Sequence, residues 1–237
     1  ASVRAWDRAA GRTVHIPLSE LRLAYRDSAL KRSLTDPDVG AGRTWGPTGR
    51  WVVLSATFHV RQASLSAPIA YRQLAGALGV DMGARVDARE VREAVLALRR
   101  SKGMVLDADD HDTWSAGSFF TNPILTRAAA AALPEDAPRF PVTDHTRVVA
   151  GVQDAPVVDG LVKTSAAWLI DHAGFPKGFA APGAHGRASL STRHVLALTN
   201  RGGATAADVA ALRDTIVAGV RERFGITLVP EPVAVGW

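Results

Sequence analysis

The chain has 237 residues, of which 47% are hydrophobic and 22% are charged, which is ordinary for a soluble globular protein. It contains 28 Lys and Arg residues against 23 Asp and Glu residues, and it has no cysteine. The missing cysteines exclude disulfides, thiolate metal sites and a cysteine nucleophile, and they are compatible with the cytoplasm. No apolar run reaches the length of a membrane span, so we expect no membrane partner.

The formal charge of +5 comes from basic residues that are scattered along the sequence. Only Arg99, Arg100 and Lys102 form a cluster. A nucleic-acid surface would instead group its Lys and Arg residues on one face, with aromatic residues between them. We therefore expect a small anionic ligand at this cluster and no nucleic-acid partner. Binding of nucleic acid through the net charge stays open as an alternative.

The first elements in chain order are predicted to be a β-hairpin, because residues 2–7 and 12–18 alternate in hydrophobicity around a turn. A short amphipathic stretch follows up to residue 31, and residues 33–49 are rich in Gly, Asp, Pro and Thr, which indicates a loop. Strict alternation over 51–61 predicts a strand. The apolar residues expected on one face of that strand are Val52, Leu54, Ala56, Phe58 and Val60.

A helix is predicted to begin after Asp87, since the run Asp-Ala-Arg-Glu resembles a capping box, and to end near Arg100. A second helix is predicted after Thr205, with Gly225 as its C-terminal stop. The stripe expected to be buried on the first helix comprises Val91, Ala94, Val95 and Leu98, and that on the second comprises Val209, Leu212, Ile216 and Val220.

The other elements expected in the second half are short. They are a helix over 125–132, an irregular stretch with one strand over 134–160, a helix over 163–173, and strands over 194–199 and 226–235. Helices and strands do not alternate regularly in this order. The sequence therefore predicts an α+β fold with mixed or antiparallel sheets and packed helices.

The most informative segment is residues 115–123, which read Ser-Ala-Gly-Ser-Phe-Phe-Thr-Asn-Pro. Its glycine lets the backbone approach a ligand closely, and Ser118 places a hydroxyl against two aromatic rings. Arg26 offers a planar fork for a carboxylate, Lys102 a point charge for a phosphate, and Glu231 a carboxylate braced by two prolines. These four residues could converge on one anionic ligand; the alternative is that each is an ordinary surface group.

Several other kinds of site are excluded by spacing. Gly40, Gly42 and Gly46 resemble a dinucleotide fingerprint, but a strand follows them where that motif requires a helix. The chain has neither a P-loop nor the G-x-S-x-G context of a nucleophilic serine. The seven histidines show no metal-ligand spacing, and His111 lies in an acidic stretch that is typical of a solvated loop. We therefore expect no metal site.

The segment 115–123 resembles the G-S-F-F-x-N-P signature of the UDP-N-acetylenolpyruvoylglucosamine reductases. Five further segments resemble motifs of that family and occur in the same order as in the family. They are Tyr-Arg-Asp-Ser at 25–28 with Lys31, Arg-Arg-Ser-Lys at 99–102, Lys-Thr-Ser-Ala-Ala-Trp-Leu-Ile-Asp at 163–171, Ala-Leu-Thr-Asn at 197–200, and Phe-Gly-Ile at 224–226 with Pro-Glu at 230–231. Together they span nearly the whole chain.

The resemblance implies an enzyme of peptidoglycan precursor synthesis in the cytoplasm, which uses FAD and NADPH to reduce UDP-N-acetylenolpyruvoylglucosamine to UDP-N-acetylmuramate. By the same resemblance, Ser118 would be the general acid that protonates the substrate carbon. Arg26 and Glu231 would stabilise the enolate-like state that forms after hydride transfer. Tyr71, Lys102 and Asn122 would hold the nucleotide and its diphosphate.

The resemblance also implies a domain organisation. Residues 1–100 would be the remainder of a flavin-binding region with the substrate-covering tyrosine loop of the long-form members, residues 101–226 the substrate-binding domain, and residues 227–237 a terminal strand that returns to the active site. The family's N-terminal flavin-binding domain is expected to be missing from this chain. An alternative for the isolated chain is therefore a non-catalytic module that binds a UDP-sugar. The oligomeric state is left open.

Overall fold

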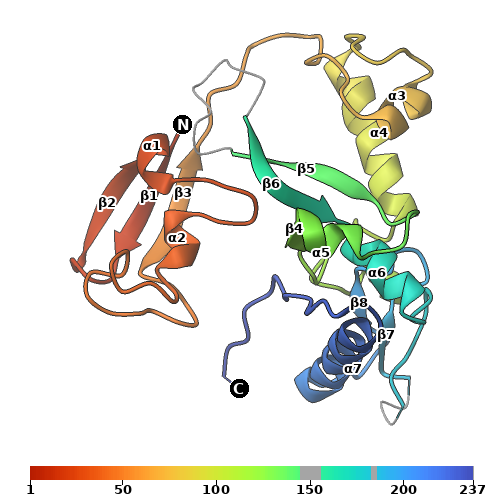
Figure 1. Cartoon of the computed structure of the whole chain (residues 1–237). Coiled ribbons are helices and arrows are strands. Elements are labelled where there is room, and N and C mark those ends of the chain that lie inside the picture. The colour runs from red at the N-terminus through yellow and green to blue at the C-terminus, as the bar shows by residue number, and fades with distance from the viewer. Residues whose placement is uncertain (145–155, 183–185, 237) are drawn as a thin grey trace.

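The computed structural model describes residues 1–144, 156–182 and 186–236. Its N-terminal unit, residues 1–57, is a three-stranded antiparallel sheet in the order β2-β1-β3, with two short helices against it (Figure 1). The elements are β1 (Ser2–Asp7), β2 (Arg12–Pro17), α1 (Leu18–Leu21), α2 (Ala29–Arg32) and β3 (Trp51–Thr57). Ala5, Ile16 and Leu21 form its small core. The predicted hairpin is thus confirmed, and so is the loop over 33–49.

The strand predicted over 51–61 is confirmed only as far as Thr57, and its apolar face is not buried. Val52 and Leu54 are about half exposed, and Phe58 and Val60, beyond the strand, are 76% and 86% exposed. The core residues of this sheet lie on β1, β2 and α1, and the β3 residue that packs against them is Trp51, on the opposite face of the strand from the predicted stripe. The alternation of apolar residues therefore predicted the strand correctly, but it did not predict whether another element packs on its apolar face.

A buried ion pair ties the end of β1 to the start of β3. The Asp7 carboxylate, 4% exposed, accepts hydrogen bonds from Arg50 Nε at 2.9 Å and Arg50 Nη2 at 2.7 Å. These bonds lower the pKa of Asp7, against the opposing effect of burial. The charge-assisted pairing fixes the loop that precedes β3 on the sheet.

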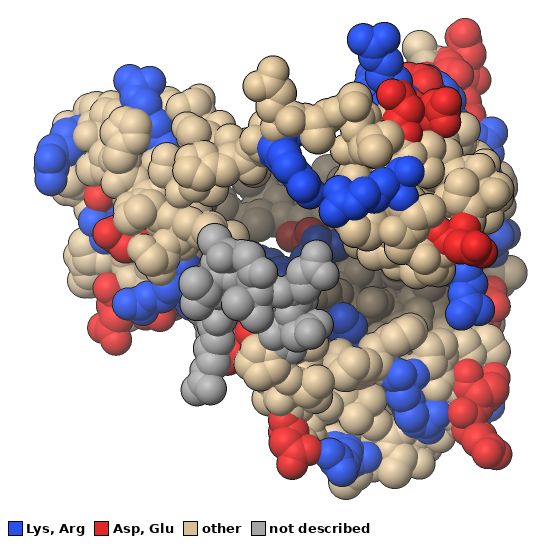
Figure 2. Space-filling view, turned by 90° about the horizontal axis from the view of Figure 1, so that it is seen from above, with Lys and Arg blue, Asp and Glu red and all other residues tan. Residues whose placement is uncertain are grey.

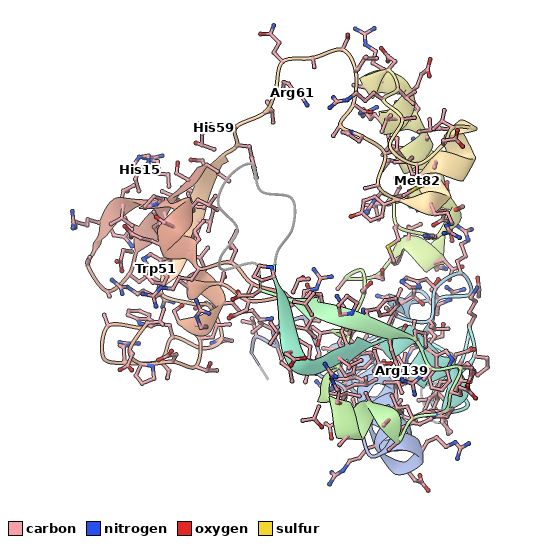
Figure 3. All side chains as sticks on the ribbon, turned by 45° about the horizontal axis from the view of Figure 1, so that its top comes forward. His15, Trp51, His59, Arg61, Met82 and Arg139 are labelled. Carbon is pink, nitrogen blue, oxygen red and sulfur yellow. The ribbon has the colours of Figure 1, made fainter. Side chains whose placement is uncertain are left out.

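An extended segment carries the chain from β3 to a pair of helices, with His59 and Arg61 on the way (Figure 3). The pair consists of α3 (Arg72–Leu78) and α4 (Ala88–Ser101). Asp87 caps α4 by accepting hydrogen bonds from the backbone of Arg89 and Glu90, as the sequence predicted. Helix α3 was not predicted, because it is short and begins at Tyr71 without a side-chain cap.

The prediction of a buried stripe on α4 is wrong in its burial, because this helix has no buried residue, although three of the four predicted residues contact a partner. Val91, Ala94 and Leu98 pack against the small core formed by residues of α3 and the segment before it, namely Ile69, Leu74 and Ala75. Val95 is 37% exposed and lines a cavity instead. The apolar stripe of α4 is wider than its contact with the seven-residue helix α3, so Val95 at the edge of the stripe is free to make other contacts.

The remaining elements form the C-terminal unit, residues 109–236, with two antiparallel sheets in the orders β4-β6-β5 and β7-β8 (Figure 1). Its core is the largest of the chain and includes Phe120 and Leu169. The elements are η1 (His111–Thr113), β4 (Ile124–Thr126), α5 (Arg127–Ala131), β5 (Arg139–Thr143), β6 (Val157–Thr164), α6 (Ala166–His172), β7 (Ala188–Leu190), β8 (Leu198–Asn200) and α7 (Ala206–Phe224). The predicted α+β class with antiparallel sheets is confirmed.

Two predicted boundaries in this unit are wrong for local reasons. The helix predicted from residue 163 begins only after Ser165, whose side chain accepts a hydrogen bond from Trp168 N, and the residues before it belong to β6. The strand predicted over 194–199 begins only at Leu198. Residues before it form a turn in which Ser191 Oγ accepts from the backbone of Arg193 and His194. Serine side chains define both boundaries.

The longest helix confirms its predicted ends. The Thr205 side chain accepts from Asp208 N while the Asp208 side chain accepts from the Thr205 backbone, and Gly225 ends α7 at a φ of 69°. Leu212, Ile216 and Val220 are fully buried, so this helix supplies the predicted stripe to the core. None of the described helices combines the length and the apolar character that crossing a membrane requires.

The strand predicted over 226–235 is wrong. The segment runs extended from α7 toward the N-terminal unit, and its pairing with the segment around Ser118 is a single bridge between Phe120 and Pro230 (Figure 1). Pro230 and Pro232 have no backbone N–H to extend such a bridge into a ladder. Glu231 is nonetheless held between them, because its backbone N–H donates to Phe119 O at 2.8 Å.

Candidate active site

The Ser118 segment is fixed on both sides by backbone hydrogen bonds. On one side Phe119 N donates to Leu196 O at 2.7 Å, in the turn between β7 and β8. On the other side Thr121 N donates to Val229 O at 3.0 Å, and Phe119 O accepts from Glu231 N. Gly117, with a φ of 78°, provides the left-handed turn just before the serine. Ser118 is therefore placed, half-buried, between a turn and the C-terminal segment.

Arg26 reaches the C-terminal segment from the other end of the chain. Its Nε lies 2.9 Å from Glu231 Oε2, and the two side chains are 49% and 33% exposed. The backbone of Arg26 has a φ of 54°, which is left-handed and unusual for a residue with a side chain. Next to it the Tyr25 hydroxyl accepts a hydrogen bond from Asn122 N at 3.3 Å. The N-terminal and C-terminal units thus meet at two of the predicted site residues.

A cavity of about 590 Å³ brings together Tyr71, Lys102 and Ser118. It lies between the helix pair and the C-terminal unit. Figure 2 shows that the molecule is hollowed on one face, with Lys and Arg side chains on part of the rim and acidic side chains deeper inside. Among the described residues, the lining of this cavity contains no carboxylate. The residues that line it are Tyr71, Arg72, Gln73, Leu74, Val95, Leu98, Arg99, Lys102, Met104, Ser118, Arg193 and His194. The lining combines apolar and cationic side chains, which suits an anion that carries an apolar group.

Two of the other predicted site residues, Arg26 and Asn122, line a second cavity of about 640 Å³ together with Lys31. The Asn122 side chain also has a structural contact, since its Oδ1 accepts from Ala166 N at 3.0 Å at the start of α6. Five of the six predicted residues are therefore divided between two cavities, and Glu231 lines neither of them but is paired with Arg26. The backbone bond between residues 119 and 231 connects the two groups.

The cationic wall contains residues that the sequence alone did not indicate. Arg193 is held by Asp110, with 2.8 Å between Nη2 and Oδ2, and Lys102 donates to Gln73 Oε1 at 2.7 Å. His194 is half-buried beside them, and its pKa is lowered by burial and by the nearby charges of Lys102 and Lys177. Arg193 and His194, unlike Lys102, belong to no periodic pattern or recognised motif, so no sequence signal pointed to them.

The turn that carries Arg193 and His194 is anchored by a buried carboxylate. Asp112, 5% exposed, accepts from Thr192 N at 2.9 Å, from the Thr192 hydroxyl, and from Arg201 Nη1 at 2.7 Å. Burial alone would raise the pKa of Asp112, but these bonds outweigh it and lower the pKa from 3.8 to about 2. The carboxylate is thus charged at neutral pH and joins η1 to the β7–β8 turn.

The loop with Gly40, Gly42 and Gly46 does not fit the diphosphate of a dinucleotide. Its three glycine N–H groups donate to Asp36 O at 2.9 Å, Pro37 O at 2.8 Å and Leu34 O at 3.0 Å, so none is free for a phosphate. In the part of the chain that the structure describes, no group of three His, Asp or Glu side chains could hold a metal ion. His111 stacks edge-on against Trp114, with 4.5 Å between ring centroids.

Comparisons with known proteins show the family of this chain. The model of the UDP-N-acetylenolpyruvoylglucosamine reductase C-terminal domain matches residues 109–235, more than half of the chain. Curated proteins named UDP-N-acetylenolpyruvoylglucosamine reductase are similar over almost the whole chain. The identity is 50% over 235 residues for the protein of Streptomyces avermitilis, 48% over 238 residues for that of Thermobifida fusca and 46% over 236 residues for that of Cutibacterium acnes.

These matches cover 99%, 99% and 100% of this chain but only 58%, 59% and 54% of the three relatives, respectively. The chain therefore spans a little over half the length of the relatives that it matches. The matched domain contains Ser118, Asn122 and Glu231, together with the turn that carries His194. The chain belongs to the UDP-N-acetylenolpyruvoylglucosamine reductase family, and residues 109–235 are its C-terminal domain.

Proposed function

We propose that this chain is the substrate-binding part of a FAD- and NADPH-dependent reductase that converts UDP-N-acetylenolpyruvoylglucosamine to UDP-N-acetylmuramate. The observation that carries the proposal is the cavity in which Ser118 faces a cationic wall without a carboxylate. The substrate is an anion with a diphosphate and a carboxylate, and the apolar side of the cavity suits its uracil or sugar. The named activity of the relatives supports the same substrate.

The chemistry that FAD supplies when bound is delivery of a hydride, taken from NADPH, to the terminal vinyl carbon of the enolpyruvyl ether. Ser118 holds the proton for the neighbouring carbon, where negative charge develops. A serine hydroxyl is a very weak acid, so it needs positive charge close to the alkoxide that it forms. Lys102 lines the same cavity as Ser118. Arg26 is connected to the Ser118 segment through Glu231, with which it pairs and whose backbone N–H donates to Phe119 O.

Glu231 would hold Arg26 in place through their ion pair, and the two residues together would stabilise the enolate-like state. Tyr71, Lys102 and Asn122 would hold the nucleotide. Tyr71 is 76% exposed at the start of α3, which fits a residue that closes over a ligand. On this proposal residues 1–100 belong to the flavin region and its tyrosine loop, residues 101–226 bind substrate, and residues 227–237 return Glu231 to the site.

The proposal is tested by Ser118→Ala in the flavin-loaded reductase that contains this chain. Reduction of the flavin by NADPH should proceed at the wild-type rate, because it does not use this proton. Reoxidation by UDP-N-acetylenolpyruvoylglucosamine should slow by about 100-fold or more, the usual contribution of a general acid. Ser101→Ala is the control, since Ser101 is exposed at the end of α4 and donates to Leu98 O. Wild-type reoxidation in Ser118→Ala would remove Ser118 from this role.

A second candidate function is a UDP-sugar-binding module without redox chemistry. One observation favours it: the N–H groups of Gly40, Gly42 and Gly46 all donate to backbone carbonyls of residues 34–37, so none is free to bind the diphosphate of a flavin. Calorimetric titration of this chain with UDP-N-acetylglucosamine, together with its absorbance spectrum, distinguishes the two functions. A colourless chain that binds the nucleotide supports the module, whereas a purified chain with bound flavin supports the complete enzyme.

A further inference from the structure

We propose that His194 couples anion binding in the Ser118 cavity to proton uptake, so that the protein binds the diphosphate of a nucleotide sugar together with one proton. The inference deepens the function proposed above and rests on it. It concerns a residue that the proposed reduction does not use.

The imidazole of His194 belongs to the Ser118 cavity and is held in place there. His194 lines the same cavity as Ser118 and Lys102, on the turn between β7 and β8. This turn is held by the Asp112 carboxylate through Thr192 and by the Leu196–Phe119 backbone bond, so the ring is carried on a fixed support. Within the described residues, no side-chain hydrogen bond engages the ring of His194, which leaves its nitrogens available to a ligand.

The charge around the ring is positive. The charged side chains that line the cavity with His194 are all cations, and Asp110 and Asp112, which contact this turn, are paired with arginines. The cations are Arg72, Arg99, Lys102 and Arg193, and Lys177 also acts on the ring. The other polar side chains that line the cavity are Tyr71, Gln73 and Ser118. A positive charge on the ring is therefore unfavourable in the free protein, in agreement with its lowered pKa.

An anion reverses this balance. A diphosphate placed among these cations offsets the repulsion from Lys102 and Lys177 and accepts a hydrogen bond from a protonated ring. The pKa of His194 then rises on binding, and the complex takes up a proton from solution near neutral pH. By linkage, affinity must increase as the pH falls through the pKa of the complex, and it must level off below the pKa of the free protein.

The test is calorimetric titration of this chain with UDP-N-acetylglucosamine, whose doubly esterified diphosphate does not itself titrate near neutral pH. Titrations at pH 6.5 in buffers of different ionisation enthalpy give the number of protons taken up. We expect net uptake of a large fraction of one proton, and affinity about tenfold tighter at pH 6 than at pH 8. His194→Gln should bind without proton uptake and with affinity that is nearly independent of pH.

Two further results make the outcome unambiguous. His194→Lys carries a permanent charge, so it should bind at every pH without proton uptake. NMR titration of the His194 ring should show a higher pKa in the complex than in the free chain. Binding without proton uptake by the wild type, or equal uptake by His194→Gln, overturns this inference and leaves the proposed function standing. Absence of any nucleotide binding overturns both.

Discussion

Arg26 and Glu231 come from opposite ends of the chain, and their side chains meet with 2.9 Å between Nε and Oε2. The pair joins the N-terminal unit to the segment that runs beside Ser118, because the Glu231 backbone is bonded to Phe119. Arg26 holds this position with a left-handed backbone, which costs about 1–2 kcal/mol for a residue with a Cβ. Backbone strain of this kind is common at functional sites.

Glu231→Gln should therefore affect function more than stability. The pair is partly exposed, so its loss should change the free energy of unfolding by less than about 1 kcal/mol. Reoxidation of the flavin by substrate should slow at least tenfold, because Arg26 is no longer oriented by a charged partner. Stopped-flow absorbance and urea denaturation measure the two effects. Glu222→Gln, in the exposed last turn of α7, should change neither. A strongly destabilised variant with normal reoxidation would contradict this role.

Gly219→Ala should destabilise the chain, although alanine normally favours a helix. A Cβ at Gly219 in α7 would lie 2.4 Å from Phe175 Cζ, a ring in the main core. Overpacking of this kind costs about 1–3 kcal/mol. Gly76→Ala in α3 is the matched control, because its Cβ meets nothing within 4 Å, and it should stabilise by up to about 1 kcal/mol. Urea denaturation of both variants checks the opposite signs; equal signs would refute the packing argument.

Thr205→Ala should weaken α7 at its first turn. The Thr205 hydroxyl accepts from Asp208 N and donates to Asp208 Oδ2 at 2.7 Å. Loss of such a cap costs about 1 kcal/mol. Thr205→Ser keeps the hydroxyl and should be nearly neutral, which separates the cap from the methyl group. Thermal denaturation measures both variants, and the cap assignment fails if they melt together.

Asp112→Asn should change how stability depends on pH. The pKa of Asp112 is lowered from 3.8 in the unfolded reference to about 2 in the folded chain, so the folded state holds fewer protons between these values. The stabilisation is therefore complete above pH 4 and is lost as the pH falls through 2. The variant should lose about 1–3 kcal/mol at pH 7, where the charged hydrogen bonds are missing.

Between pH 4 and 2 the variant should then lose less further stability than the wild type does. Melting temperatures over pH 2–7 check this, and Asp159→Asn is the control because Asp159 is exposed and pairs with Arg127 only at the surface. A variant with the acid dependence of the wild type would show that Asp112 does not carry this pH effect.

Much of the fold could be predicted because its signals are local. Alternation determines the hairpin β1–β2, and a cap together with an apolar stripe determines α4 and α7. The same signals failed where a single side chain sets the boundary of an element. Ser165 caps α6, so the helix begins later than predicted, and two prolines prevent a strand around Glu231. Helix α3 has neither cap nor long periodicity, so only its packing against α4 reveals it.

The sequence by itself determined which chemical groups belong to the candidate site, namely Ser118, Lys102, Arg26 and Glu231. Each of these residues lies in a short motif that can be recognised without knowledge of the fold. The tertiary structure decided which of them share a cavity, and it added His194 and Arg193 from a turn with no motif of its own. The physical reason is that a cavity is assembled by packing and hydrogen bonds between distant segments. Charge and burial at one residue then depend on neighbours that its own stretch of sequence does not contain.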